Sequence, residues 1–147
     1  MADDSARFAL PYLQPGQAQK EFFHNEALTT IDALLHPVAQ TIGDNAPPST
    51  SAIGQCWIIG PSPTGAWSGH GDAIAYWSEG GWRFIAPKPG MMIWLAMDGV
   101  WAREDAGAWA VGAAIPDPAG GTIVDIEARA AINALLAAVR AHGLIAT

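Results

Sequence analysis

Hydrophobic residues recur at spacings of three and four in the first third of the chain, which is the period of an α-helix. The apolar positions are Phe23, Ala27, Ile31, Leu34 and Val38, and Leu28 and Leu35 widen the stripe that they form. Pro37 marks the end of this stretch, because the residue before a proline rarely stays helical. The pattern predicts an amphipathic helix over residues 17–36, with an extended leader at 8–13 before it and a linker at 41–51 after it.

The middle of the chain changes to short apolar runs that glycine-rich breaks divide, as expected for antiparallel hairpins. These runs predict strands at 55–59, 73–77, 82–85 and 91–97, and a last one around 109–111. All the tryptophans lie in this stretch, at Trp57, Trp67, Trp77, Trp82, Trp94, Trp101 and Trp109. The pattern predicts a small Trp-rich antiparallel β meander.

A weak repeat, Gly-x-Trp, occurs four times in this β region. The copies are Gly65-Ala-Trp67, Gly80-Gly-Trp82, Gly99-Val-Trp101 and Gly107-Ala-Trp109. Glycine suits the tight turn of a hairpin, so we expect each copy to place a tryptophan near the start of a returning strand.

A helical period returns over residues 122–142, after a Pro/Gly linker at 115–121. Thr122 and Asp125 have the form of a capping box, and Gly143 is suited to end the helix. One broad apolar face contains Val124, Ala128, Ala131, Ile132, Leu135, Ala138 and Val139, with Leu136 at its border, whereas Arg129, Asn133 and Arg140 form a narrow polar strip. A helix that is apolar over most of its circumference needs cover on more than one side. The pattern therefore predicts either a short parallel bundle, with three copies favoured, or a helix docked on its own domain.

These patterns together predict an α+β fold in three parts. Residues 1–50 hold the leader, the N-terminal helix and a linker, residues 51–112 form the Trp-rich β domain, and residues 113–147 hold the Pro/Gly linker and an oligomerisation helix. The residues expected to make the contacts between copies are Val124, Ala128, Ile132, Leu135, Leu136 and Val139.

The charge content changes this picture by pointing to partners. The chain has 147 residues and a net charge of −7; half of its residues are hydrophobic and only 14% are charged, against roughly 25% in an average soluble domain. This composition excludes intrinsic disorder. Seven basic residues spread along an acidic chain also argue against nucleic acid as a partner. So little charge indicates that part of the surface is buried against other copies of the chain.

Signals for export, membranes, disulfides and metals are all weak. Asp3 and Asp4 stand where a secretory peptide would carry basic residues, and no apolar run reaches the roughly 18 residues of a membrane helix. The single cysteine, Cys56, excludes an intrachain disulfide framework and a multi-cysteine zinc site. We expect synthesis in the cytoplasm without export, no membrane partner, and no metal or cofactor.

Catalytic groups are hard to assemble from this sequence. His24 and Glu26 are two residues apart on a predicted helix, so they point about 200° apart and cannot share a metal ion. Ser68, His70 and Asp72 have the residue types of a catalytic triad, but they are neighbours in one loop and no nucleophile-elbow sequence is present. The sequence therefore predicts that the protein is not an enzyme.

The number of tryptophans exceeds what so small a sheet is expected to bury. Trp67 lies in a loop without strand pattern, so it either packs down onto the domain or presents a flat face to a ligand. Sugar rings stack on such faces while carboxylate and imidazole groups bind their hydroxyls. The candidate carbohydrate-binding residues are Trp67, His70 and Asp72, then Trp101 and Trp82.

Several motifs resemble a phage-type family, the domain-of-unknown-function family 2793. They are Leu10-Pro-Tyr-Leu-Gln-Pro-Gly-Gln-Ala-Gln-Lys20, His24-Asn-Glu-Ala-Leu28, Asp32-Ala-Leu34, Gly65-Ala-Trp67-Ser-Gly-His70 and Gly81-Trp-Arg-Phe-Ile-Ala-Pro87. The resemblance covers roughly residues 8–112, and the family has no agreed catalytic residues to carry over. Such domains occur in prophages and gene transfer agents, among tail-fibre, host-specificity and head-spike components.

The resemblance implies a virion component, and such appendages are symmetric oligomers, commonly trimers. We expect a head-spike or tail-fibre protein of a phage-like particle, made in the cytoplasm, assembled into the particle and released with it. Its partners would be other copies of itself, other virion proteins and host surface polysaccharide. One alternative is a purely structural adaptor without a ligand. The last is a polysaccharide hydrolase, which would need two carboxylates facing each other across a cleft.

Overall fold

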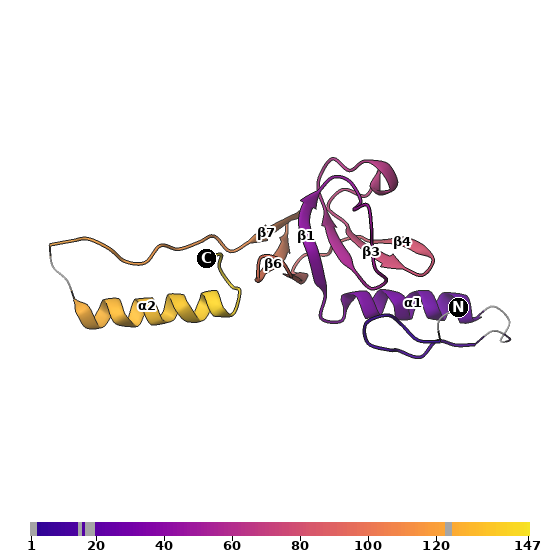
Figure 1. Cartoon of the computed structure of the whole chain (residues 1–147), viewed down its shortest axis with the longest axis horizontal. Coiled ribbons are helices and arrows are strands. Elements are labelled where there is room, and N and C mark those ends of the chain that lie inside the picture. The colour runs from indigo at the N-terminus through magenta and orange to yellow at the C-terminus, as the bar shows by residue number, and fades with distance from the viewer. Residues whose placement is uncertain (1–2, 15, 17–19, 123–124) are drawn as a thin grey trace.

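The computed structural model describes residues 3–14, 16, 20–122 and 125–147, and its fold is α+β (Figure 1). Helix α1 (Lys20–Leu34) precedes a seven-stranded sheet, and helix α2 (Ile126–Ala141) follows it. The strands are β1 (Val38–Asp44), β2 (Cys56–Ile59), β3 (Ile74–Ser78), β4 (Gly81–Ile85), β5 (Met92–Leu95), β6 (Val100–Asp105) and β7 (Ala108–Val111), with a short 3-10 turn η1 (Gly65–Trp67) between β2 and β3. The molecule is elongated because α2 extends away from the sheet.

The sheet is mixed, so the prediction of a purely antiparallel meander is wrong. Its strand order is β4-β3-β2-β1-β5-β6-β7, and β1 pairs in parallel with both β2 and β5. On either side of β1 lies an antiparallel meander of three strands, β2-β3-β4 and β5-β6-β7. The central strand thus comes from residues 38–44, where the sequence pattern had predicted the end of the first helical stripe and a linker.

Three of the four Gly-x-Trp copies lie at hairpin turns, so the interpretation of that repeat is confirmed for these three and wrong for Gly65-Ala-Trp67. In each of the three, a glycine with positive φ (Gly81, Gly99 and Gly107) leads into the returning strand. Trp82 then lies opposite Trp77, and Trp101 lies opposite Trp94. The remaining copy forms η1. Strand β6 begins in one of these hairpins and was not predicted.

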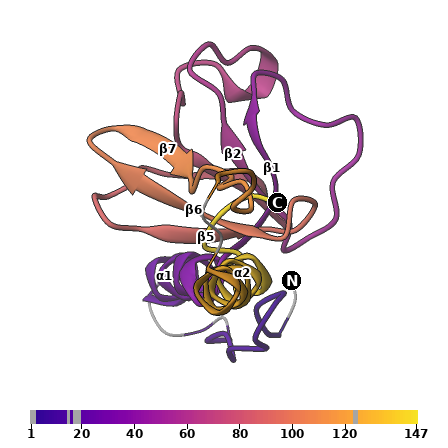
Figure 2. The same ribbon diagram turned by 90° about the vertical axis from the view of Figure 1, so that its left-hand side faces the viewer.

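The two faces of the sheet carry different cores, because successive side chains of a strand point to opposite sides. Cys56 and Ile58 of β2, with Tyr76 of β3, belong to a cluster that also receives Ala33 of α1. Trp57 and its alternate neighbours belong to a second cluster, which the loop between β2 and β3 covers. Figure 2 shows α1 below the sheet and strands β5 to β7 crossing the direction of β1 and β2.

Helix α1 leaves much of its predicted apolar stripe exposed, although Leu34 at its end packs against the core, so the expected amphipathic packing is not shown. Phe23 is 77% exposed and Ile31 is 51% exposed, whereas Asp32 and Ala33 are buried. The opposite, mostly polar side of the helix is covered by the leader, which the period of the helix alone could not reveal. The side-chain amide of Asn25 pairs with both backbone groups of Leu13, at 2.9 and 3.1 Å.

Asp32 fixes the leader to the helix and to the sheet. Its fully buried carboxylate accepts hydrogen bonds from the Ser5 hydroxyl (2.7 Å), from the backbone N–H groups of Arg7 (3.0 Å) and Phe8 (2.7 Å), and from the Tyr76 hydroxyl (3.3 Å). Four donors compensate the cost of removing this charge from water. The leader is therefore an integral, packed part of the domain.

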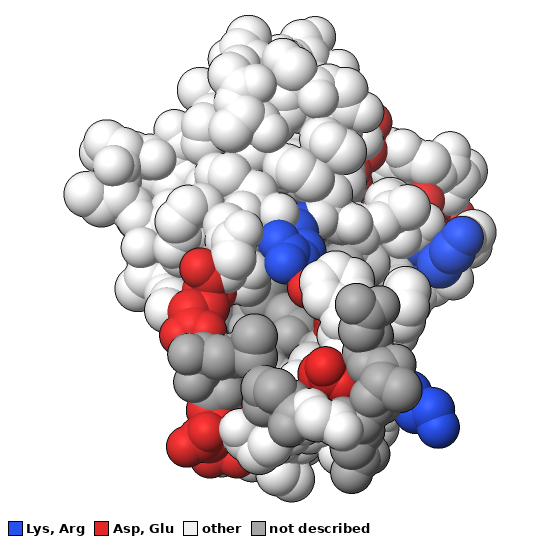
Figure 3. All heavy atoms as spheres, turned by 90° about the vertical axis from the view of Figure 1, so that its right-hand side faces the viewer, with Lys and Arg blue, Asp and Glu red and all other residues white. Residues whose placement is uncertain are grey.

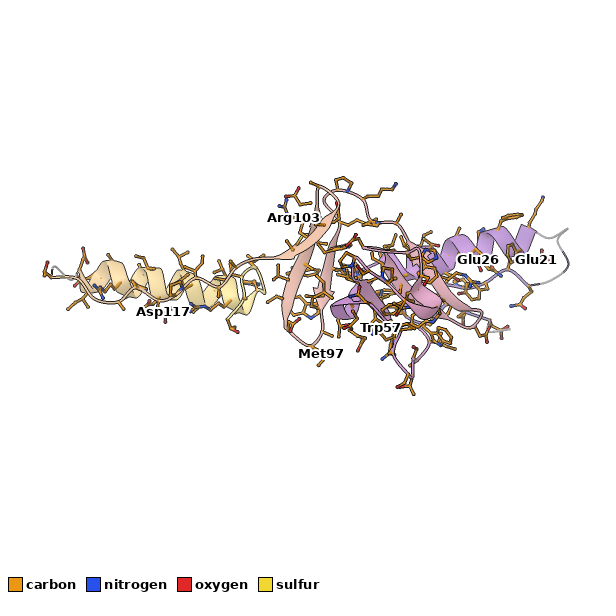
Figure 4. All side chains as sticks on the ribbon, turned by 90° about the horizontal axis from the view of Figure 1, so that it is seen from above. Glu21, Glu26, Trp57, Met97, Arg103 and Asp117 are labelled. Carbon is orange, nitrogen blue, oxygen red and sulfur yellow. The ribbon has the colours of Figure 1, made fainter. Side chains whose placement is uncertain are left out.

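Helix α2 and the extended segment 113–122 form an arm beside the sheet, and Asp117 of that segment lies along the helix (Figure 4). Asp125 caps the helix by accepting a hydrogen bond from the N–H of Ala128 at 2.8 Å, so the cap is three residues later than Thr122. The chain then returns to the sheet, where the carbonyl of Gly143 accepts from the N–H of Trp101 at 2.9 Å. Gly143 has a φ of +65°, and a Cβ there would lie 2.5 Å from the Trp94 ring.

Candidate functional site

Four tryptophans form a cluster under the loop that joins β2 and β3. Trp57, Trp67 and Trp82 contact one another with ring centroids 5.3 to 6.4 Å apart, and Trp77 packs edge-on against Trp82 at 4.8 Å. Tilted and edge-to-face arrangements of this kind stabilise aromatic cores beyond the area that they bury. The cluster is the core of this face of the sheet.

Trp67 takes the first of its two predicted alternatives: it packs down onto the domain. Its side chain is 0% exposed, and its indole N–H finds no hydrogen-bond partner within the described residues. The expectation that Trp67 presents a face to a sugar is therefore not met in this structure. The reason is that η1 turns the ring inward against Trp57 and Trp82.

His70 and Asp72 do not complete an open platform with Trp67. The imidazole of His70 stacks on Phe84 with the ring centroids 3.7 Å apart. Asp72 has a φ of +61°, and its backbone carbonyl accepts a hydrogen bond from the indole of Trp109 at 2.9 Å. This bond ties the loop to β7, so the loop residues hold the two halves of the sheet together.

The other tryptophan candidates lie on separate halves of the sheet. Trp82 belongs to the β3–β4 hairpin, whereas Trp101 pairs edge-on with Trp94 in the β5–β6 hairpin, with ring centroids 5.2 Å apart. Both Trp82 and Trp101 are half-buried, so each keeps part of its ring in contact with solvent. They are two separate aromatic surfaces.

A groove that the sequence did not predict lies between α1 and the β3–β4 hairpin. Its volume is about 630 Å³, and Glu26 and Arg83 lie in its wall. The two side chains form a bidentate ion pair, with Oε1–Nη2 at 2.7 Å and Oε2–Nε at 2.9 Å. Figure 3 looks onto this end of the molecule, where acidic atoms flank a basic one, and Figure 4 shows Glu21 and Glu26 along α1.

The ion pair sets the charge of the groove. The hydrogen bond from Arg83 lowers the pKa of Glu26 and, reciprocally, raises that of Arg83, so both groups are ionised at neutral pH. Their charges offset each other, and Glu21 of the same wall adds a negative charge to the groove. The sequence excluded a metal site at His24 and Glu26 but did not reveal the ion pair of Glu26 with Arg83, because these two residues are 57 positions apart.

Other reactive groups of the domain are not poised for chemistry. Burial raises the pKa of the Cys56 thiol to about 12, which keeps it protonated and unreactive at neutral pH. Across the described residues, no three His, Cys, Asp or Glu side chains come together in a way that could hold a metal ion. In the same part of the chain, neither α-helix has the length and apolarity to cross a bilayer.

The predicted contact residues of α2 divide into two groups. Ala128, Ile132 and Leu135 are exposed, and Leu135 keeps 66% of its surface in solvent. Val139 is half-buried, and Leu136, only 8% exposed, is covered within its own chain. Val124 lies outside the described residues.

The two arginines of the polar strip of α2 lie against the extended segment, whereas Asn133 of the same strip is exposed. Arg129 donates to the carbonyl of Pro118 at 3.4 Å and to that of Gly120, and Arg140 pairs with Asp117 at 2.8 Å. Leu136 lies on the same strip, one turn before Arg140, and is covered with it. The helix thus holds its two arginines, half-buried, against its own linker and leaves Ile132 and Leu135 exposed.

Comparison with known proteins identifies the family of this chain. No curated protein matches it. The family model described as protein of unknown function (DUF2793) matches residues 24–110, which is more than half of the chain and includes most of α1 and nearly all of the sheet. The leader motif at 10–20 lies outside the matched residues. The chain belongs to the DUF2793 family.

Proposed function

We propose that the protein is a structural component of a phage-like particle, of the head-spike or tail-fibre kind. In this proposal it is made in the cytoplasm, joins the particle as a homotrimer through its C-terminal arm, and contacts host surface polysaccharide through its β domain. The resemblance to virion proteins supports the setting. The observation that carries the proposal is the exposed apolar face of α2, whose arginines bind the linker of their own chain.

The arm supports self-association because a soluble helix normally turns its charged strip to water. Here the guanidinium groups of Arg129 and Arg140 are bound by the linker of the same chain, and the face with Ile132 and Leu135 is left exposed. Burying a leucine or isoleucine side chain fully stabilises a protein by about 1.5–3 kcal/mol. A neighbouring arm offers the same apolar face.

Three copies suit this helix better than two. Ala128, Ile132, Leu135 and Val139 fall within one side of the helix, and Ala131 and Ala138 extend that side further from the linker. A face this wide is covered by two neighbours, which a threefold bundle provides for each chain. Small alanine side chains also allow the helices to approach closely.

Sedimentation equilibrium at micromolar concentration tests the assembly. We expect three times the 15.4 kDa of one chain. Leu135→Asp places a charge in the apolar face and should give single chains, whereas Ala130→Asp, on the opposite and also exposed side of α2, should leave the trimer intact. A single-chain mass for the wild type, or an intact Leu135→Asp trimer, would overturn the role of the arm.

Contact with polysaccharide is supported by the half-exposed rings of Trp82 and Trp101 at two hairpins. Indole rings present a rigid apolar face on which the C–H faces of sugars stack. A pull-down with purified capsule tests this contact: the wild type should bind, and Trp82→Ala with Trp101→Ala should weaken binding. Failure of the wild type to bind any capsule or glycan would remove this part of the proposal.

A purely structural adaptor is the second candidate, and the packing of the tryptophans favours it. Trp57 and Trp67 are buried, and each of the other rings except Trp109 packs edge-on against another tryptophan. Quenching of tryptophan fluorescence by iodide separates the two candidates. An adaptor predicts that no ring remains open to iodide in the trimer, whereas a polysaccharide-binding protein predicts that Trp82 or Trp101 does.

A further inference from the structure

The groove between α1 and the β3–β4 hairpin has the size of a ligand site. Its volume of about 630 Å³ falls within the range of sites that hold small molecules. A second hollow of about 330 Å³ shares Tyr12, Thr29, Ser78 and Glu79 with it. Because they share these lining residues, the two hollows lie next to each other, and we refer to the pair as the trough.

Polar contacts cross-link the wall of the trough. The bidentate ion pair joins Glu26 of α1 to Arg83 of β4, and the Tyr12 hydroxyl lies 2.8 Å from that of Thr29. These bonds tie the leader, the helix and the hairpin to one another. A ligand therefore meets a preformed surface and loses little free energy in ordering it.

The trough offers hydrogen-bond acceptors to a ligand. Glu21 lines it, and its Oε2 atom is buried without a hydrogen-bond partner among the described residues. A buried carboxylate oxygen is costly to leave unpaired, so it favours a ligand that donates a hydrogen bond. Hydroxyl groups are such donors.

Charge decides which hydroxyl-bearing ligands fit. Arg83 is paired with Glu26, so among the described lining residues no unpaired cation is left to bind an anion, and Glu21 adds a negative charge to the trough. A sugar that carries a carboxylate would meet like charges at close range. A neutral sugar has no such penalty.

Phe22 supplies the apolar part of the site. It lines the groove, keeps 63% of its surface in solvent, and packs edge-on against Phe23 with ring centroids 5.5 Å apart. An exposed aromatic ring beside carboxylate, amide and hydroxyl groups matches the two sides of a pyranose, whose C–H face is apolar and whose edge is polar.

We propose that this trough binds a neutral hexose segment of a polysaccharide, with Phe22 stacking on one ring and Glu21 accepting from its hydroxyls. The proposal rests on the polysaccharide contact proposed above, and it assigns that contact to α1 and the β3–β4 hairpin. Uronate-bearing segments are excluded by the charge of the same wall.

A glycan array with neutral hexose and uronate oligosaccharides, followed by calorimetry with the best neutral oligosaccharide, tests the assignment on the full chain. We expect binding to neutral oligosaccharides and not to uronates. Phe22→Ala and Glu21→Gln should each weaken binding at least tenfold, and Glu21→Gln should also reduce the discrimination against uronates. Phe8→Ala is the matched control, because Phe8 is an exposed phenylalanine outside the groove.

The outcomes separate this inference from the function on which it rests. Neutral-glycan binding that survives both groove variants overturns the site but leaves the polysaccharide contact standing. Preference for uronates overturns the ligand class. A wild type that binds no glycan and no capsule overturns the contact and the site together. Circular dichroism of each variant separates loss of binding from loss of fold.

Discussion

Substitutions of Trp67 test whether this residue packs in the core or binds a ligand, the two alternatives that the sequence left open. The ring is fully buried between Trp57 and Trp82, and its N–H makes no hydrogen bond within the described residues. Two substitutions probe these properties separately. Trp67→Ala removes the ring, whereas Trp67→Phe keeps an aromatic ring and removes the unpaired N–H.

The structure gives a magnitude for each change. Truncating a buried tryptophan to alanine costs about 3–5 kcal/mol, because a cavity remains. Trp67→Phe loses a few buried carbon contacts, about 1–2 kcal/mol, but it also removes an unsatisfied buried donor, whose desolvation costs about 1–3 kcal/mol. The net change in the free energy of unfolding should stay within about 1 kcal/mol.

Trp109→Phe is the matched comparison, since it makes the same chemical change where the N–H is bonded. The indole of Trp109 donates to the Asp72 carbonyl at 2.9 Å. Its replacement loses both packing and that hydrogen bond, so we expect a destabilisation of about 2 kcal/mol. The hydrogen bond predicts that Trp109→Phe is the more destabilising of the two phenylalanine variants, although Trp109 is only half-buried and Trp67 is fully buried.

Urea unfolding followed by far-ultraviolet circular dichroism measures these changes, because fluorescence would change with the tryptophan content. All variants are compared at one protein concentration, since assembly contributes to apparent stability. A Trp67→Ala variant that loses less than about 1 kcal/mol while losing polysaccharide binding would refute the reasoning. That result would make Trp67 a ligand face instead of a core residue.

Three further predictions concern single groups. Asp32→Ala leaves buried donors without their acceptor and should cost about 3–5 kcal/mol in urea unfolding, whereas Asp98→Ala, in an exposed turn, should change stability by less than about 0.5 kcal/mol. With its pKa near 12, the Cys56 thiol should not react with Ellman's reagent in the folded protein at pH 8 and should react rapidly in urea; equal rates would show that it is accessible. Because Arg83 lowers the pKa of Glu26 below its value in the unfolded chain, the pair stabilises the fold above that unfolded value and loses its effect as the pH falls through the folded pKa. Glu26→Gln should therefore cost less than about 1 kcal/mol at pH 7, since the pair is partly exposed, and nothing once the wild-type group is protonated; a cost that persists in acid would contradict this.

The β hairpins were predictable because their signal is local. Glycine is favoured at the positive-φ positions of a tight turn, and Gly81, Gly99 and Gly107 mark three such turns in the sequence. The helices were also predictable as helices, since their periods are regular. Their orientation was not, because period identifies which residues share a side and says nothing about which side meets the rest of the chain.

Strand β1 and the groove depend on contacts between distant residues. Val38–Asp44 carries no alternation strong enough to separate it from a linker, and it becomes a strand by pairing with β2 and β5. Glu26 and Arg83 are 57 residues apart, so their pairing is visible only when the helix lies on the hairpin. The burial of Trp67 likewise depends on a loop whose path its sequence does not specify.

The position of β1 also bears on the order in which the chain folds. Each meander joins strands that are neighbours in sequence; its hairpins β3–β4, β5–β6 and β6–β7 have short turns and can form early, whereas residues 60–73 separate β2 from β3. The central strand must instead find β5, whose Trp94 pairs with Val38 across more than fifty residues, and its register with β2 shifts twice within one strand. We expect the two meanders to form first and β1 to pair with them late. Pairing of β1 with β2 and β5 would then be the slow step of refolding, and these pairings would be the first to break when force is applied to the chain.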